Sequence, residues 1–102
     1  MTSHPTITCF GELLIDMIST NTGNLVVSKG FLKKFGGAPG NTAAGLAKLG
    51  VPTAFIGKVG NDPFGTFLKT SLDAYGVDTK GLVISKIDRT TLAFVSLTTA
   101  GE

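Results

Sequence analysis

Apolar residues along this chain gather in runs, and most of the runs predict strands of a buried sheet. The longest covers residues 7–18 and is typical of a central strand that is covered on both faces. Two more runs, 53–60 and 90–98, predict a second buried strand and a last strand. Shorter apolar segments at 25–27 and 82–84 predict a short strand and a return to the sheet or to an edge ribbon.

A stretch of small residues between the first two buried strands predicts a helix. Asn41 is a good N-cap, and Ala43, Leu46 and Ala47 follow at helical spacing until Gly50 ends the segment. Because nearly every residue of this helix is small, it can pack tightly against a sheet.

A second helix is predicted from Pro63 onward. Asn61 and Asp62 offer an N-cap, Pro63 fits the first helical position, and Gly76 ends the segment. We interpret the capping pair and Lys58 as structural rather than catalytic, because capping already explains the pair. The helix carries an apolar stripe typical of core packing, formed by Phe64, Phe67, Leu68, Leu72 and Tyr75.

Turn residues separate these elements. Segments 19–23 and 86–89 predict turns, and residues 100–102 resemble the start of a hairpin turn. The order of strands and helices predicts an α/β fold with a parallel sheet.

Composition narrows the class of protein. Hydrophobic residues make up 42% of the 102 residues and charged residues 16%, a balance typical of a piece of a larger buried sheet. The net charge is +2, and the basic residues form no cluster along the sequence. We therefore expect neither a nucleic-acid nor a membrane partner. No apolar run approaches the ~20 residues of a membrane span, and the first residues lack the apolar core of a signal peptide. The single cysteine, Cys9, excludes an internal disulfide and favours a cytoplasmic location.

The stretch 35–50 is a glycine-rich loop that leads directly into the first helix. Backbone N–H groups exposed at a helix N-terminus suit a polar ligand. The loop matches neither common nucleotide-binding pattern, since Leu46 stands where the P-loop requires Lys and Ala38 where the dinucleotide motif requires Gly. One histidine, His4, and one cysteine offer no metal cluster. The loop therefore serves another kind of ligand, or only a tight turn.

Asp16 interrupts the first apolar run near its end. A buried carboxylate is costly unless something hydrogen-bonds to it, and ligands of open α/β sheets lie at the carboxyl ends of strands. From the residues alone, Asp16 is either a ligand-binding carboxylate or a solvated strand end or turn cap.

Four segments together resemble the pfkB, or ribokinase-like, family of carbohydrate kinases, and fructokinases most within it. They are 11–16, 36–50, 55–65 and 89–95, and they cover almost the whole chain. The resemblance implies the N-terminal part of a ribokinase-like parallel-sheet domain with a small β-lid. Residues 1–102 would be the sugar-binding part, and the C-terminal ATP-binding part of the domain would be absent.

The resemblance also implies roles for five residues. Asp16 would accept hydrogen bonds from adjacent sugar hydroxyls, and Gly36 and Gly37 would let the sugar rest against the backbone. Asn41 would both donate to and accept from the sugar. Ala93, on the lid strand, would face the sugar.

The implied activity is transfer of the γ-phosphoryl group of ATP, with Mg²⁺, to a hydroxyl of a small-molecule sugar. In this family the general base and the phosphate-binding backbone belong to a downstream Gly-Ala-Gly-Asp segment. Nothing in residues 1–102 matches that segment, so the chain alone is expected to be inactive. Ribose, 2-keto-3-deoxygluconate or a nucleoside are alternative substrates, and a non-catalytic truncated copy is the alternative class. The sequence does not indicate an oligomeric state.

Overall fold

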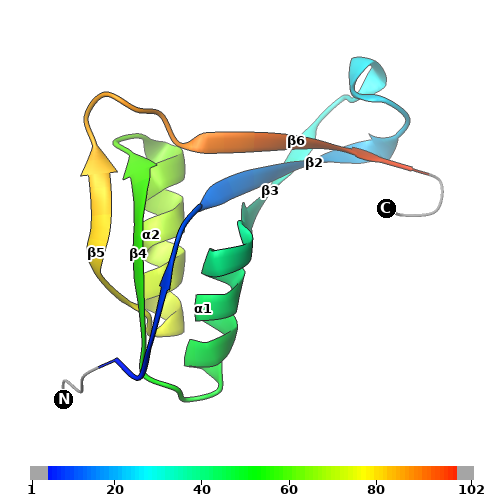
Figure 1. The fold of residues 1–102 in the computed structure, drawn as a ribbon. Helices are drawn as coiled ribbons and strands as arrows, with labels where there is room; N and C mark the ends of the chain where they lie inside the picture. Colours follow the sequence, from blue (N-terminus) through cyan, green and yellow to red (C-terminus); the bar gives the residue numbers. More distant parts are fainter. Residues whose placement is uncertain (1–4, 99–102) are drawn as a thin grey trace.

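The chain forms two small β-sheets whose strands run in different directions (Figure 1). The computed structural model describes residues 5–98, and within this range each sheet has three strands. We call them the core sheet and the lid sheet. The two sheets are joined to two α-helices, so the α/β class predicted from the sequence is confirmed.

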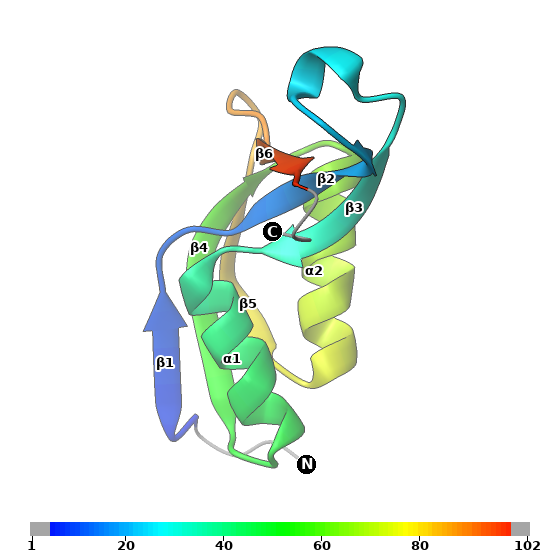
Figure 2. The same cartoon turned by 90° about the vertical axis from the view of Figure 1, so that its right-hand side faces the viewer.

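The core sheet is entirely parallel and contains β1 (Ile7–Phe10), β4 (Thr53–Gly60) and β5 (Asp78–Ser85), in the order β1-β4-β5. Helices α1 (Ala38–Lys48) and α2 (Pro63–Tyr75) both pack on one face of it (Figures 1 and 2). This is the parallel sheet that the order of elements predicts.

The lid sheet contains β2 (Leu14–Thr22), β3 (Phe31–Gly36) and β6 (Thr91–Leu97). Strand β2 lies in the centre, antiparallel to β3 and parallel to β6. The strands of the lid sheet run across the direction of the core strands and extend away from the helices (Figure 1).

The prediction of one long strand over residues 7–18 is wrong, because the run divides between the two sheets. Strand β1 ends at Phe10, and Gly11 then adopts φ +137°, a backbone conformation that residues with a side chain rarely reach. The chain turns there and enters the lid sheet at Leu14. A hydrophobic run records burial but not the sheet to which each part belongs.

Two local predictions after this run are also wrong. The predicted turn at 19–23 is mostly strand, because β2 continues to Thr22. The Asn21 side chain explains its polar character, since it accepts from the Lys29 backbone N–H at 2.8 Å and donates to the Val27 carbonyl at 3.0 Å. The predicted strand at 25–27 is a single 3₁₀ turn, η1 (Leu25–Val27), whose hydrogen bonds are local.

The other elements follow the sequence closely. Strand β4 has the predicted bounds, and β5 and β6 contain the predicted segments 82–84 and most of 90–98. Helix α2 begins after Asp62, whose carboxylate caps the Gly65 backbone N–H at 2.7 Å, and ends at Gly76 in the left-handed conformation. His4 and the predicted hairpin turn at 100–102 lie outside the described residues.

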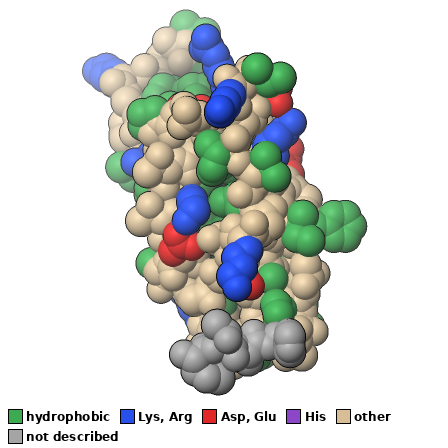
Figure 3. Space-filling view, turned by 90° about the vertical axis from the view of Figure 1, so that its left-hand side faces the viewer, with side chains coloured by type: hydrophobic (Ala, Val, Ile, Leu, Met, Phe, Trp, Pro, Cys, Tyr) green, Lys and Arg blue, Asp and Glu red, His purple; other side chains and the backbone are tan. Residues whose placement is uncertain are grey.

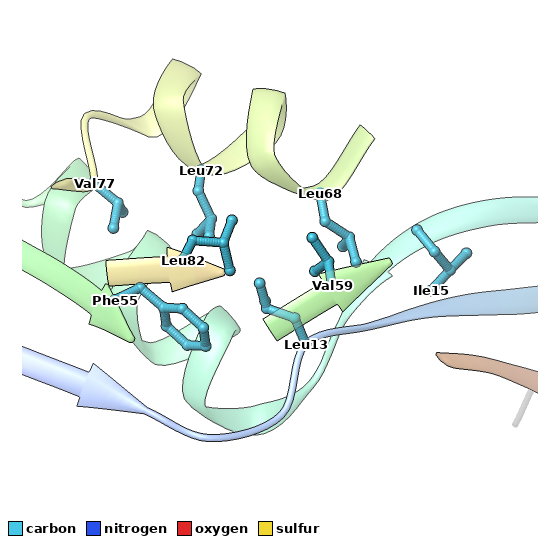
Figure 4. Close-up of a cluster of buried hydrophobic side chains, with 9 residues drawn as sticks. Leu13, Ile15, Phe55, Val59, Leu68, Leu72, Val77 and Leu82 are labelled. Atoms are coloured by element: carbon cyan, nitrogen blue, oxygen red, sulfur yellow. The ribbon is translucent and has the colours of Figure 1, made fainter. Parts of the chain in front are cut away.

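The main core lies between the two helices and the covered face of the core sheet (Figure 4). Leu68 points from α2 toward Val59 on β4, and Leu72 points toward Leu82 on β5. Both leucines and Phe55 on β4 are fully buried. Leu13 and Ile15 come from the crossing into the lid sheet and join the same cluster. The two sheets therefore share one core.

The opposite face of the core sheet is open. Side chains alternate along β4, so Phe55 and Val59 are buried while Ile56, between them, is 52% exposed. Phe10 and Val83 on the neighbouring strands are 75% and 57% exposed. Seen from the side of β5, hydrophobic groups also reach the surface among Lys and Arg side chains (Figure 3).

We expect the isolated 102-residue chain to self-associate through this open face and to be marginally stable. Ile56→Thr should reduce the association, measured by light scattering over a range of concentrations, with little effect on the melting temperature. Val59→Thr is the matched control on the buried side of the same strand. It should instead cost about 1–3 kcal/mol of stability, because it buries a hydroxyl. A monomeric wild-type chain with a sharp, reversible melt would contradict this expectation.

Candidate functional site

Strand register places Asp16 on the face of the lid sheet that points away from the core. Its neighbours in the ladder are Lys34 on β3 and Ala93 on β6, so all three lie in one row on this face. The adjacent residue Ile15 is fully buried on the opposite face. The predicted residues Asp16 and Ala93, 77 positions apart in the sequence, are therefore brought together.

Gly36 lies on the same face, close to Asp16. A Cβ atom at Gly36 would lie 2.6 Å from Oδ2 of Asp16 and 2.8 Å from Cδ1 of Leu14. The Asp16 carboxylate therefore occupies the space above the missing side chain. It is half-buried, and among residues 5–98 it forms no hydrogen bond or ion pair.

Gly37 has a separate structural reason to be glycine. Its φ is +98°, and a Cβ there would lie 2.5 Å from the backbone oxygen of Glu12. The residue lets the chain leave β3 and enter α1 directly against the crossing from β1 to β2. Gly37 is therefore constrained by its own positive φ and by the backbone of Glu12, whereas the atoms nearest to a Cβ at Gly36 belong to side chains.

Asn41 is not the N-cap that the sequence predicts. Helix α1 begins at Ala38, with Gly37 as its N-cap and Pro39 in the first turn, where the missing N–H of proline costs nothing. The Asn41 backbone N–H instead donates to the Gly37 carbonyl at 2.9 Å. Its side chain is exposed and forms no hydrogen bond with any other described residue. The amide is therefore free of a capping role and one turn from the glycine pair.

Ala93, rather than Phe94, faces the Asp16 side of the sheet. Phe94 points to the opposite face, where its ring meets Phe31 edge to face at a centroid distance of 5.2 Å. Ala93 therefore lies on the same face as Asp16, and its role toward a sugar stays a prediction.

The sequence analysis did not identify two residues that matter for the lid sheet, Lys34 and Thr90. Lys34 lies beside Asp16 without an ion pair among the described residues, whereas Lys33 points to the other face, 4.1 Å from the ring centroid of Phe67. Strand alternation would have found Lys34 once 31–36 had been identified as a strand. The other residue is Thr90, whose backbone N–H donates to Asp62 and is the main cause that lowers the pKa of this carboxyl group below its usual range. No sequence spacing links these two residues.

A cavity of about 550 Å³ lies elsewhere, between the start of α2 and the loop after β5. It is lined by residues 61–64 and 85–90 and by Leu92, which belongs to the core-facing side of the lid sheet. None of the predicted site residues lines it. Residues 5–98 contain no group of three or more His, Cys, Asp or Glu side chains that could hold a metal ion. In the same range, no helix is long and apolar enough to cross a membrane.

Comparison with known proteins gives one consistent result. The pattern of the pfkB family carbohydrate kinases matches residues 4–102. The chain is 48% identical over 99 residues to the probable fructokinase-6, chloroplastic, of Arabidopsis thaliana. This alignment covers 96% of the chain and 26% of the plant protein.

Two solved structures agree with this match. A sugar kinase from Pyrococcus horikoshii in complex with ATP superposes with a TM-score of 0.88 at 46% identity, over 93% of this chain and 32% of that one. A fructokinase from Vibrio cholerae with bound fructose, ADP and calcium ion gives 0.79 at 35% identity, over 89% and 28%. The chain thus spans about a quarter to a third of the length of the proteins it matches.

The two kinds of glycine in this region should respond differently to alanine. Gly37→Ala should lower stability by about 1–3 kcal/mol or more, because the residue is held in a conformation unfavourable for a side chain. Gly45→Ala, within α1, is the control, since its Cβ would meet nothing within 4 Å. It should raise stability by roughly 0.5–1 kcal/mol. Thermal unfolding of both variants at the same low concentration tests this, and a Gly37→Ala variant as stable as the parent chain would contradict it.

Proposed function

Because the chain belongs to the pfkB family of carbohydrate kinases, we propose that it is the sugar-binding part of an ATP-dependent sugar kinase whose substrate is fructose. One observation carries the proposal. The half-buried carboxylate of Asp16 lies above Gly36 and forms no hydrogen bond with any of residues 5–98. Because no described residue uses these oxygens and they are not sealed from solvent, they are available to a ligand, and sugar hydroxyls are suitable donors.

The chemistry of the face suits a sugar. The two oxygens of Asp16 accept charge-assisted hydrogen bonds from two adjacent hydroxyls. Gly36 leaves room for the ring beside the backbone, and the small side chain of Ala93 leaves the same row open. The exposed amide of Asn41 can both donate and accept at the start of α1. Gly37 contributes by holding α1 against the lid.

The rest of the reaction requires residues beyond this chain. In the proposed reaction a sugar hydroxyl attacks the γ-phosphorus of ATP, ADP leaves, and the hydroxyl proton passes to a general base. The Pyrococcus and Vibrio structures were solved with ATP and ADP respectively. The described residues provide neither a phosphate-binding loop nor a metal cluster, so we assign no step with ATP or Mg²⁺ to them. We propose that residues 1–102 form the N-terminal part of one kinase domain and act in a reducing, cytoplasmic setting.

One observation favours a second substrate class. Lys34 places an ammonium group that has no ion-pair partner among residues 5–98 in the same row as Asp16. A cation here suits a sugar acid such as 2-keto-3-deoxygluconate, whose carboxylate would pair with it. Relative kcat/KM for fructose and for the sugar acid separates the two classes, and Lys34→Met should lower the value only for the acid.

Fructose phosphorylation should require the complete kinase. A complete kinase carrying these 102 residues should convert fructose and ATP to a sugar phosphate and ADP. The isolated chain should show no turnover above a control without sugar, because a positioned base and electrostatic stabilisation of the phosphoryl group together supply several orders of magnitude in rate. ATP-dependent phosphorylation by the isolated chain, or none by the complete protein, would contradict the proposal.

Asp16→Asn should weaken the use of the sugar without affecting ATP. A lost charge-assisted hydrogen bond costs about 1.5–3 kcal/mol, so kcat/KM for the sugar should fall about tenfold or more while the KM for ATP stays unchanged. Gly36→Ala should act in the same direction by displacing the carboxylate. Asp78→Asn is the control, since the Asp78 carboxylate, on the core sheet, accepts a hydrogen bond only from the Lys80 backbone N–H among the described residues. If Asp16→Asn changes only the melting temperature, Asp16 is structural and the sugar site lies elsewhere.

A further inference from the structure

The chain passes between the core and the lid at three places within residues 5–98. They are residues 11–13, between β1 and β2; Gly37, between β3 and α1; and residues 86–90, between β5 and β6. The first two depend on glycines with positive φ, Gly11 and Gly37. Among these described crossings, only the third is held by the side chain of a carboxylate from a helix cap, Asp62.

The Asp62 carboxylate accepts hydrogen bonds from both the backbone N–H and the side-chain hydroxyl of Thr90. Its Oδ2 accepts from the Thr90 backbone N–H at 2.9 Å, and its Oδ1 accepts from the Thr90 hydroxyl at 2.7 Å. Oδ1 also accepts from the Gly65 backbone N–H at 2.7 Å, in the first turn of α2. The carboxylate therefore joins the start of α2 directly to the residue before β6.

Thr90 also binds the core sheet, and we call the hydrogen-bonded group of Asp62, Thr90, Gly60 and Gly65 the joint. Its Oγ1 accepts from the Gly60 backbone N–H at 2.9 Å, at the end of β4. A Cβ at Gly60 would lie 2.5 Å from Oδ2 of Asp62 and 2.6 Å from the Thr90 nitrogen, and one at Gly65 would collide with the Gly60 carbonyl oxygen. Two glycines thus bring the strand end and the helix start close enough for one carboxylate to hold both.

The loop before Thr90 is ordered separately. Ser85 Oγ accepts from the backbone N–H groups of Ile87 and Asp88, and Asp88 pairs with Lys58 at 2.7 Å. This ion pair is exposed, and such pairs contribute little to stability. The buried Thr90 and its carboxylate partner are therefore the stronger constraint on where β6 begins.

The position of β6 matters because Ala93, three residues after Thr90, is the ladder neighbour of Asp16. We propose that Asp62 and Thr90 are positioning residues that fix the orientation of the lid sheet relative to the core sheet. This orientation in turn sets the distance between Asp16 on the lid sheet and Asn41 on α1. This inference rests on the proposed function for its kinetic consequence. Both residues line the cavity at the start of α2, which none of the predicted sugar-binding residues lines, so we propose no direct contact between them and the sugar.

The test compares hydroxyl deletions at the two ends of α2 in a complete kinase carrying this chain. Thr90→Val removes the hydroxyl from the joint, and Thr90→Ser retains it. Thr79→Val is the matched control, because the Thr79 hydroxyl also donates to an α2 carboxylate at 2.7 Å, Asp73, but at the end remote from the lid.

Thr90→Val should raise the KM for the sugar about fivefold or more, the scale of one lost hydrogen bond, while the KM for ATP stays unchanged. Thr90→Ser should restore the parent value, and Thr79→Val should leave both KM values unchanged. A sugar KM within twofold of the parent, together with a lower melting temperature, would overturn the proposal, since a merely structural role moves only the second quantity.

Amide hydrogen exchange provides a second readout that does not depend on the substrate. Thr90→Val should increase exchange in β2 and β6 and at the Gly60 backbone N–H, which loses its acceptor, but not along the rest of β4. Thr79→Val should leave the lid strands unchanged. If the parent kinase fails to phosphorylate fructose, the proposed function is wrong while the exchange experiment still tests the joint. Unchanged exchange in β2 and β6 of Thr90→Val would overturn the positioning role whatever the substrate.

Discussion

Burial of Ile15 decides on which side of the lid sheet the Asp16 carboxylate lies. Ile15 is completely inaccessible and belongs to the core shared with Leu68 and Phe55. Because side chains alternate along a strand, its neighbour must point to the opposite face, and a slip of one residue would move every side chain of β2 to the wrong side. The register of the lid, and therefore the row that contains Asp16 and Ala93, follows from a hydrophobic contact on the other face.

Sequence reasoning succeeded where local chemistry and structure agree. The Asp62 cap, the apolar stripe of α2 and the strand at 53–60 are determined by neighbouring residues, and the structure has them where they were predicted. It failed at Gly11 and at Asn41. A strand break inside a continuous apolar run has no signature other than a glycine, and Asn41 fits a cap as well as an interior position. Pro39 was the better indicator of the helix start.

The candidate site was predictable as a set of residues, but its geometry was not. Asp16, Gly36 and Ala93 came from the family resemblance, and they lie on one face only because β2 pairs with both β3 and β6. Such pairing joins residues far apart in the sequence and has no local pattern. For the same reason the Thr90–Asp62 contact, between residues 28 positions apart, could not be predicted. The sugar-binding roles themselves stay predictions.

The adjacent residues Lys33 and Lys34 show how a strand separates two identical charges. The Lys33 ammonium lies 4.1 Å from the centroid of the Phe67 ring and links β3 to α2, whereas Lys34 extends from the face that carries Asp16. Acetylation removes the positive charge from either residue, but the physical result differs. At Lys33 it would weaken a packing contact inside the protein, worth about 0.5–1 kcal/mol at an exposed site. At Lys34 it would leave the packing intact and make the electrostatic potential over the open face more negative, so that an approaching anion would be repelled.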